Sequence, residues 1–133
     1  CAQTMESAMG TARESALETV DIVLGFYKKM ASASSDYAYM GELSDIEEFR
    51  NDVDYINNHG PFLTVGTPEF FIERIEKLRE LGADEVILCM DGLEHEAHMQ
   101  AIELIGERVI PVLQKERGTD SEKSAASQSY EDV

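Results

Sequence analysis

Two short segments carry residues that are able to bind a polar or anionic ligand, and each follows an apolar run. Gly66 lets the backbone approach a ligand closely, and Thr67 begins a helix whose free N–H groups attract an anion. Asp91 is able to act as an acid or base or to hold a substrate group, and Gly92 follows it. These four residues are the candidate cofactor-binding set. The favoured alternative is that they only cap helices and close turns, as every strand–helix unit requires.

Two histidines follow the second of these segments. His95 and His98 are three residues apart, and two imidazoles on one helical face are able to ligate a metal ion. No third ligand stands at a fixed spacing, so the favoured interpretation is two partly solvated side chains in the first turns of a helix, and no metal is predicted. His95 remains a candidate substrate contact at a pocket mouth. His59 lies in a turn and is interpreted as structural.

The remaining reactive side chains are assigned no catalytic role. Cys89 lies within an apolar run, where a thiol without a basic neighbour is inert, so we expect it in the core. Tyr37 and Tyr39 are able to cover an apolar substrate, although exposed loop tyrosines are common. The sequence contains no GxGxxG, GxSxG or CxxC motif. The catalytic residues are therefore unknown at this stage.

The elements that would position these residues are two strands and two helices. The apolar runs Phe62–Val65 and Val86–Met90 are predicted strands, and the second lacks alternation, as in a parallel strand buried on both faces. Thr67 and Pro68 begin the helix between them, and Gly82 ends it. Parallel strands joined by such a crossover form a right-handed unit. The predicted apolar faces are Phe71, Ile75, Leu78 and Leu81 in the first helix, and Ile102, Ile105 and Val109 in the second.

The flanking regions have weaker signals. Periodicity predicts a helix from Met5 to Met30, with Gly10 as a candidate break, followed by a loop over residues 31–41. Ser44 and Glu47 have the spacing of a capping box, which predicts a second helix with an apolar stripe. Residues 114–133 have almost no large apolar side chains, and we expect a disordered acidic tail. The stripe of the second helix consists of Ile46, Phe49, Val53 and Ile56.

Composition limits the classes of function. The 133 residues include 11 basic and 27 acidic ones, for a net charge of −16, which disfavours nucleic-acid and anionic-membrane partners. A hydrophobic content of 43% is typical of a folded soluble protein, and no apolar run has the roughly 20 residues that a membrane span needs. Cys1 and Cys89 are the only cysteines. A disulfide framework is therefore not expected, and a cytoplasmic location is predicted.

A family resemblance covers Gly60 to Leu113. The ordered series VGTPEFFIERIEKLRELGADEVIL, followed by a helix that ends in ERVIPVL, resembles the C-terminal end of the luciferase-like flavin-dependent monooxygenases. The resemblance extends more loosely to CAQT and the long helix that follows. It implies an α/β fold, namely the C-terminal part of a TIM (β/α)8 barrel over residues 1–113, with two to three parallel strands and flanking helices. Because a complete barrel needs about 250 residues, we expect a fragment of a longer enzyme, and Cys1 in place of Met favours this.

The resemblance also implies a function. A whole member of the family binds reduced FMN, delivered by a flavin reductase, and oxidises a small organic substrate with oxygen, while a close branch uses the deazaflavin F420. This segment does not separate the two cofactors. The alternative is a truncated, non-catalytic α/β module that dimerises or packs on a partner, because a few strands leave exposed edges that pair with other chains. A homo-oligomer is expected in this case.

Overall fold

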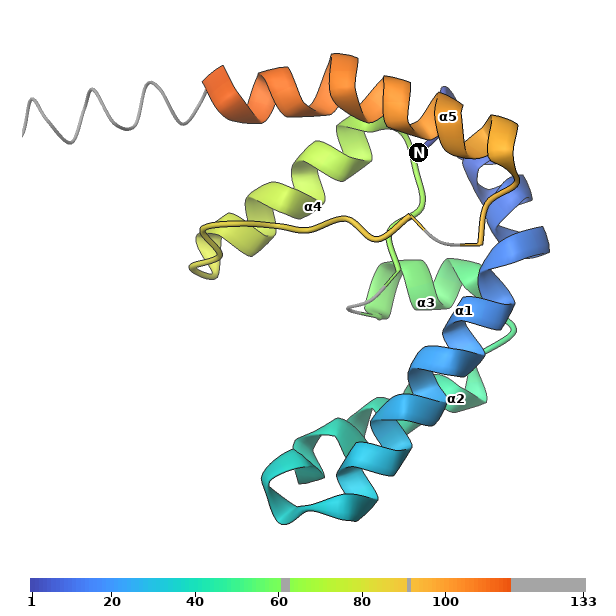
Figure 1. Ribbon diagram of the computed structural model, residues 1–133, viewed down its shortest axis with the longest axis vertical. Helices are drawn as coiled ribbons and strands as arrows, with labels where there is room; N and C mark the ends of the chain where they lie inside the picture. The colour runs from blue at the N-terminus through green and yellow to red at the C-terminus, as the bar shows by residue number, and fades with distance from the viewer. Residues whose placement is uncertain (61–62, 91, 116–133) are drawn as a thin grey trace, which may run out of the picture.

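The computed structural model describes residues 1–60, 63–90 and 92–115, except for the side chains of residues 16–17 and 40–45. All regular structure in these ranges is helical. Figure 1 shows an open arc in which α1 is the longest element, η1 and α2 fold back along its C-terminal half, and α4 and α5 lie beyond its N-terminal end. The elements are α1 (Met5–Ala33), the 3-10 helix η1 (Ser35–Ser44), α2 (Asp45–Glu48), α3 (Val53–His59), α4 (Pro68–Glu80), α5 (His95–Leu104) and the π-helix η2 (Ile105–Val109).

The predicted α/β fold, part of a TIM barrel with two to three parallel strands, is wrong for the described residues, which contain no strand or sheet. Leu63–Val65 and Val86–Met90 are extended segments without a hydrogen-bonded ladder, and Pro61 and Phe62 lie outside the described residues. Figure 1 shows the two segments running in different directions. A parallel strand requires a neighbour at hydrogen-bonding distance, and neither segment supplies one to the other.

Helix α1 confirms the predicted N-terminal helix and runs three residues further. The Thr4 hydroxyl accepts a hydrogen bond of 3.2 Å from the Ser7 backbone N–H, which satisfies one of the free donors of the first turn. Gly10 does not break the helix. One part of the buried face packs on α3 and Val65, and the other packs on α2 and α3. The buried residues of these two clusters are Ala8, Met9, Ala12, Val53 and Val65 in the first, and Val20, Leu24, Ile46 and Ile56 in the second.

The segment between α1 and α3 differs from its prediction in two ways. The expected loop over residues 31–41 is largely a 3-10 helix, and the expected single helix is divided into α2 and α3 by a turn. Asp52 caps α3, because its side chain accepts a hydrogen bond of 2.9 Å from the Tyr55 N–H. The Ser44 side chain, predicted as the cap of α2, lies outside the described residues. The apolar stripe is partly confirmed, since Phe49 is exposed and stacks on Tyr55 with ring centroids 3.8 Å apart.

Helix α4 has the predicted boundaries. Thr67 is the N-cap, Pro68 occupies the first turn, and Gly82 follows the helix with a φ of 97°, the left-handed conformation that favours glycine. The predicted apolar face is only partly buried. Phe71 lies in the core, whereas Leu81 is 85% exposed. This end of α4 therefore projects away from the described core.

The C-terminal helix continues further than expected. Helix α5 passes directly into the π-helix η2, and helical structure extends to Lys115, so residues 114 and 115 are not disordered. The rest of the predicted tail, residues 116–133, lies outside the described residues. Ile105 and Val109 pack on Phe71 of α4 as predicted, whereas Ile102 is exposed. Among the described residues, no helix combines the length and apolarity that crossing a membrane requires.

Candidate functional site

The first pair of predicted cofactor-binding residues has a structural role in the described chain. Gly66 packs so closely on Phe70 that an added Cβ would lie 2.8 Å from the ring, and its carbonyl accepts a hydrogen bond of 3.0 Å from the Ala2 N–H. The Thr67 hydroxyl accepts a hydrogen bond of 3.5 Å from the Phe70 N–H. Neither residue lines either of the two apolar depressions described below. These observations match the capping and turn role that the sequence analysis favoured.

The second pair gives a similar result. Gly92 has a φ of 79° and lies against α1, where a Cβ would meet the Ser15 carbonyl oxygen and the Thr19 hydroxyl at 3.1 Å. Glycine is therefore required both by the backbone conformation and by the close approach of α1. Asp91 lies outside the described residues, so its predicted role is neither confirmed nor contradicted. The structure does not bring Gly92 together with Gly66 and Thr67 in one pocket.

His95 and the other candidate side chains also lie away from a common site. His95 is exposed at the start of α5 and lines neither of these two depressions. Within the described ranges, no group of three or more His, Cys, Asp or Glu side chains is placed to hold a metal ion. Tyr37 and Tyr39 are exposed on η1. Cys89, expected in the core, is exposed, because its side chain points away from the helices that cover one face of its segment.

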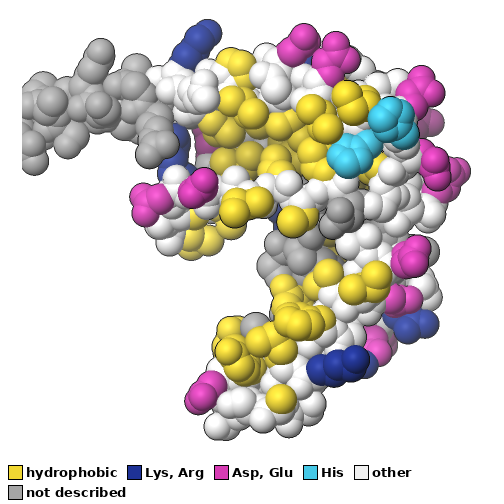
Figure 2. Space-filling model, in the orientation of Figure 1, with side chains coloured by type: hydrophobic (Ala, Val, Ile, Leu, Met, Phe, Trp, Pro, Cys, Tyr) yellow, Lys and Arg dark blue, Asp and Glu magenta, His cyan; other side chains and the backbone are white. Residues whose placement is uncertain are grey.

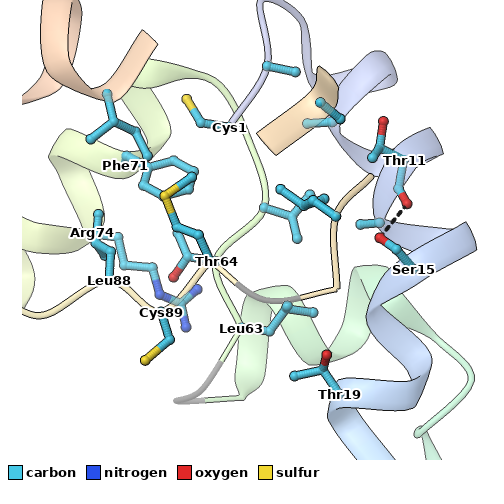
Figure 3. A pocket seen from close by; sticks show the side chains of 18 of the residues that line it. Cys1, Thr11, Ser15, Thr19, Leu63, Thr64, Phe71, Arg74, Leu88 and Cys89 are labelled. Atoms are coloured by element: carbon cyan, nitrogen blue, oxygen red, sulfur yellow. Dashed lines mark hydrogen bonds between the residues drawn. The ribbon is translucent and has the colours of Figure 1, made fainter. Parts of the chain in front are cut away.

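The feature best suited to ligand binding is a central cleft of about 660 Å³ between α1, α4 and the two extended segments. Figure 3 shows Thr11, Ser15 and Thr19 on one side of this central cleft, and Phe71 and Arg74 on the other. Its size lies within the roughly 300–1,000 Å³ of typical small-molecule sites. The lining also includes Ala8, Ala12, Val23, Leu63, Thr64, Val65, Ile75, Leu78, Val86–Met90, Leu93, Ala97 and Gln100.

The walls of the central cleft differ in chemistry. The α1 wall carries hydroxyl groups one helical turn apart, and the Ser15 hydroxyl donates a hydrogen bond of 2.9 Å to the Thr11 carbonyl oxygen. The α4 wall is aromatic and aliphatic, with Phe71, Ile75 and Leu78. A flat ligand between these walls would meet hydrogen-bonding groups on one face and apolar surface on the other. This arrangement of few polar groups in a mostly apolar cleft is typical of cofactor sites.

Arg74 is the one charged residue among those that line the central cleft in the described structure. Its guanidinium donates hydrogen bonds to the backbone carbonyl oxygens of Asn57 and Gly60, at the C-terminal end of α3. Burial lowers the pKa of this guanidinium, which nevertheless stays charged because arginine is not deprotonated in proteins near neutral pH. Arginine has five N–H donors, and these two bonds leave donors for a ligand carbonyl or phosphate.

Asn57 fixes the floor of the same region. Its side-chain amide donates a hydrogen bond of 2.8 Å to the Val65 carbonyl oxygen, and its oxygen accepts one of 2.7 Å from the Val65 N–H. Asn57 is only 3% exposed. One side chain thus satisfies both backbone groups of Val65, as a neighbouring strand would. We call this pair of bonds the Asn57 clamp.

A second depression, the outer groove, lies on the opposite side of Val86–Met90. It has a volume of about 600 Å³ and is bounded by α4 and by α5 with η2. Ile105, in the π-helical turn, lines both the outer groove and the central cleft. Turns of π-helix occur frequently at functional sites. The extended segment is therefore the partition between two apolar depressions.

Sequence reasoning missed the two residues that organise the central cleft. Asn57 stands in the run Asn57–Gly60, which signals the end of a helix, and α3 does end there. Its bonds to Val65 form because the chain reverses direction between the two residues, and this reversal leaves no local pattern in the sequence. For Arg74, the periodicity of α4 indicates only that the residue lies outside the apolar stripe.

Comparison of the chain with protein-family models, with curated proteins and with solved structures gave no match. Functional assignment therefore depends on the residues of the central cleft and on the resemblance described above.

Proposed function

We propose that this chain is part of a flavin-dependent oxidoreductase of the luciferase-like kind, and that the central cleft holds the ring system of FMN or of the deazaflavin F420. The observation that carries the proposal is the cleft itself. It has one hydroxyl-bearing wall, one aromatic and aliphatic wall, and a single guanidinium. The resemblance over Gly60 to Leu113 supplies the cofactor class. The proposal does not depend on the barrel fold that the structure contradicts.

The lining residues fit a flavin ring. Such a ring is flat and largely apolar, with carbonyl and nitrogen acceptors along one edge. The hydroxyls of Thr11 and Thr19 are able to donate hydrogen bonds to these acceptors, and Phe71 offers an apolar surface on the opposite wall. The remaining N–H donors of Arg74 suit a carbonyl or phosphate oxygen. The net charge of −16 repels an anionic cofactor in general, which makes this local positive charge more important.

The chain would contribute binding, orientation and exclusion of water. When bound, the flavin supplies the redox chemistry. The apolar α4 wall lowers the local dielectric and keeps water from the reacting edge. No described residue is assigned to proton transfer, because the described lining contains no carboxylate or imidazole. The substrate is a small organic molecule that enters beside the ring.

The proposal is tested by titrating the full chain with oxidised FMN and following flavin fluorescence. We expect saturable quenching as the ring enters the central cleft. Thr11→Trp fills the cleft from the α1 wall and should weaken binding at least about tenfold, which corresponds to roughly 1.4 kcal/mol. The matched control is Glu14→Trp, an exposed position of the same helix that lies outside the lining and should leave binding unchanged.

Two results would contradict the proposal. One is the absence of any saturable change in fluorescence for a chain whose circular dichroism shows folded helices. The other is equal binding by the Thr11→Trp and Glu14→Trp variants, which would place the flavin elsewhere. Replacing FMN by F420 in the same titration decides which of the two cofactors this chain prefers.

A further inference from the structure

The segment Val86–Met90 has the features of a β-strand without its sheet. Its residues are extended, and none of their backbone N–H or C=O groups is paired with another group of the described chain. By contrast, the preceding turn is bonded, since the Ala83 N–H donates to the Leu78 carbonyl oxygen. Unpaired strand-like backbone is a template on which another extended segment adds.

The side chains of this segment alternate between two faces. Val86, Leu88 and Met90 are half-buried, and Leu88 and Met90 pack against the cluster of Phe71, Ile105 and Val109. Ile87 and Cys89 are exposed on the other face, and Ile87 is 83% exposed. Figure 3 shows Leu88 and Cys89 leaving the chain on opposite sides. The helices α4 and α5 therefore cover one face, whereas the backbone edge and the Ile87 face, which borders the central cleft, stay open.

We propose that two copies of this chain associate by antiparallel pairing of Val86–Met90, with the two-fold axis at Ile87. The proposal concerns the edge of the segment and does not depend on flavin binding. Pairing satisfies the backbone N–H and C=O groups of alternate residues in each copy, because the groups of the intervening residues point to the opposite edge. It also places the most exposed apolar side chain of the segment directly opposite its own symmetry mate, where the two side chains shield each other from water.

Charge is compatible with this register. Antiparallel pairing about Ile87 puts Glu85 opposite Cys89 of the second copy, and Asp84 opposite Met90. Each acidic side chain thus faces an uncharged one. Centring the pair on Glu85 would instead place two carboxylates directly opposite each other, which is destabilising. An isologous pair of this kind closes on itself and gives a dimer.

The overall charge makes the association dependent on salt. Each copy carries a net charge of −16, so two copies repel each other at low ionic strength. Added salt screens this repulsion, with a Debye length of about 10 Å at 0.1 M. We therefore expect the dimer to become more stable as the salt concentration rises, because its contacts are apolar and backbone bonds and its long-range electrostatics are repulsive.

Sedimentation equilibrium of the full chain at two salt concentrations tests the association. We expect a monomer–dimer equilibrium that shifts toward dimer at the higher salt. Ile87→Lys places two ammonium groups opposite each other and should weaken the dimer at least about tenfold. The matched control is Ile22→Lys, because Ile22 is an exposed isoleucine of α1, 65% exposed, and lies outside the segment. This control should dimerise like the unaltered chain.

Disulfide trapping tests the register. In a chain with Cys1→Ser and Cys89→Ser, the substitution Ile87→Cys brings two thiols to the two-fold axis, where Cα atoms of paired residues lie about 4.5–5.5 Å apart, within disulfide range. Mild oxidation should cross-link this variant into a dimer. The unaltered Cys89 should not form the same bond, because in this register the two Cys89 residues lie four positions apart, about 13 Å.

Each outcome decides the proposal. Cross-linking through Ile87→Cys, together with loss of dimer in Ile87→Lys but not in Ile22→Lys, supports it. A monomer at both salt concentrations overturns it. So does rapid cross-linking through Cys89 of the unaltered chain, which requires another register, or equal weakening by both lysine variants, which requires another surface. Circular dichroism of every variant verifies that the helices are retained.

Discussion

The two extended segments of this protein have the same apolar character but different surroundings. Leu63–Val65 is held at its C-terminal end: the Asn57 clamp satisfies Val65, and the Ala2 N–H donates to the carbonyl oxygen of the next residue, Gly66. Val86–Met90 has no backbone partner in the described chain and rests on helices through one face only. A single buried amide thus takes the place of a neighbouring strand at Val65, whereas no described group does so at Val86–Met90.

This difference shows what an apolar run requires beyond burial. Apolar side chains contribute through the area that they remove from water, but the backbone polar groups of the same residues also need partners. Asn57 and Arg74 supply such partners around the first segment, and together they join α3, Val65 and α4. We expect the first segment to be rigid and sensitive to substitution, and the second to be tolerant.

The largest expected effect follows from removing the Asn57 clamp. Asn57→Leu keeps a similar volume but leaves the Val65 N–H and C=O without partners in a buried position. We expect the free energy of unfolding to fall by about 2–4 kcal/mol, since each buried unsatisfied group costs about 1–3 kcal/mol. Urea unfolding followed by circular dichroism measures the loss.

A neighbouring residue provides the control for the clamp. Asn58 is exposed, and its amide donates a hydrogen bond of 2.8 Å to the Asp54 carbonyl oxygen within α3. Asn58→Leu should change the free energy of unfolding by less than about 1 kcal/mol, because water replaces the lost bond. Equal losses in the two variants would mean that the clamp contributes nothing beyond helix propensity.

The next effect concerns the guanidinium that joins α4 to α3. Arg74→Met removes two charge-assisted hydrogen bonds to the carbonyl oxygens of Asn57 and Gly60 while it keeps much of the side-chain length. We expect a loss of about 1–3 kcal/mol by the same urea measurement. Lys77→Met, at an exposed position of the same helix, removes an exposed ion pair with Glu73 and should cost clearly less. If Lys77→Met costs as much, the bonds of Arg74 to α3 are not the cause.

A matched pair of substitutions compares the two segments directly. Val65→Thr places a hydroxyl in a buried site of the clamped segment and should cost about 1–3 kcal/mol. Ile87→Thr, in the open segment, should change the stability of the monomer by no more than about 0.5 kcal/mol. Both values are measured at low protein concentration so that association does not contribute. Similar costs at the two positions would contradict the difference between the segments.

The smallest effect is a pH dependence at the first turn of α4. The pKa of Glu69 is lowered by its own backbone N–H, then by the Thr67 hydroxyl and by Arg108, whose Nη2 lies 2.6 Å from Glu69 Oε1. A lowered pKa in the folded state stabilises the protein above the unfolded-state pKa, and this stabilisation is lost as the pH falls through the folded-state pKa.

Glu69→Gln should therefore lower the melting temperature slightly at pH 7. The difference from the unaltered chain should vanish in acid, below the ordinary glutamate pKa of about 4.3. Calorimetry across this pH range measures both values. A difference that persists at low pH would point to packing and not to charge.

The helices were predictable because their signals are local. Thr67, Pro68 and Gly82 mark the ends of α4 by side-chain and backbone chemistry that acts within one turn, and the same holds for the Asn57–Gly60 end of α3. The turn between α2 and α3 was not predicted, because the apolar stripe continues through it. Within this stripe Asp52 caps a new helix, α3. Local signals of this kind determine helix boundaries when no tertiary contact overrides them.

The sheet was predicted incorrectly for a different reason. An apolar run such as Val86–Met90 indicates extended structure, but pairing depends on what lies beside it in space, which the run itself does not encode. The predicted cofactor residues Gly66, Thr67 and Gly92 were chosen from their place after strands, and their local requirements as cap and turn residues explain their identity. Asn57 and the cleft residue Arg74 act across the chain and left no local pattern.

Amide hydrogen exchange of Val86–Met90 at low and high protein concentration tests the central claim most directly. The account predicts rapid exchange in the dilute monomer, where these N–H groups have no partner in the described chain, and slowed exchange when the chain is concentrated in salt. The Val65 amide, held by Asn57, should be protected under both conditions. Strong protection of Val86–Met90 in the dilute monomer would reveal an internal strand partner and contradict the account.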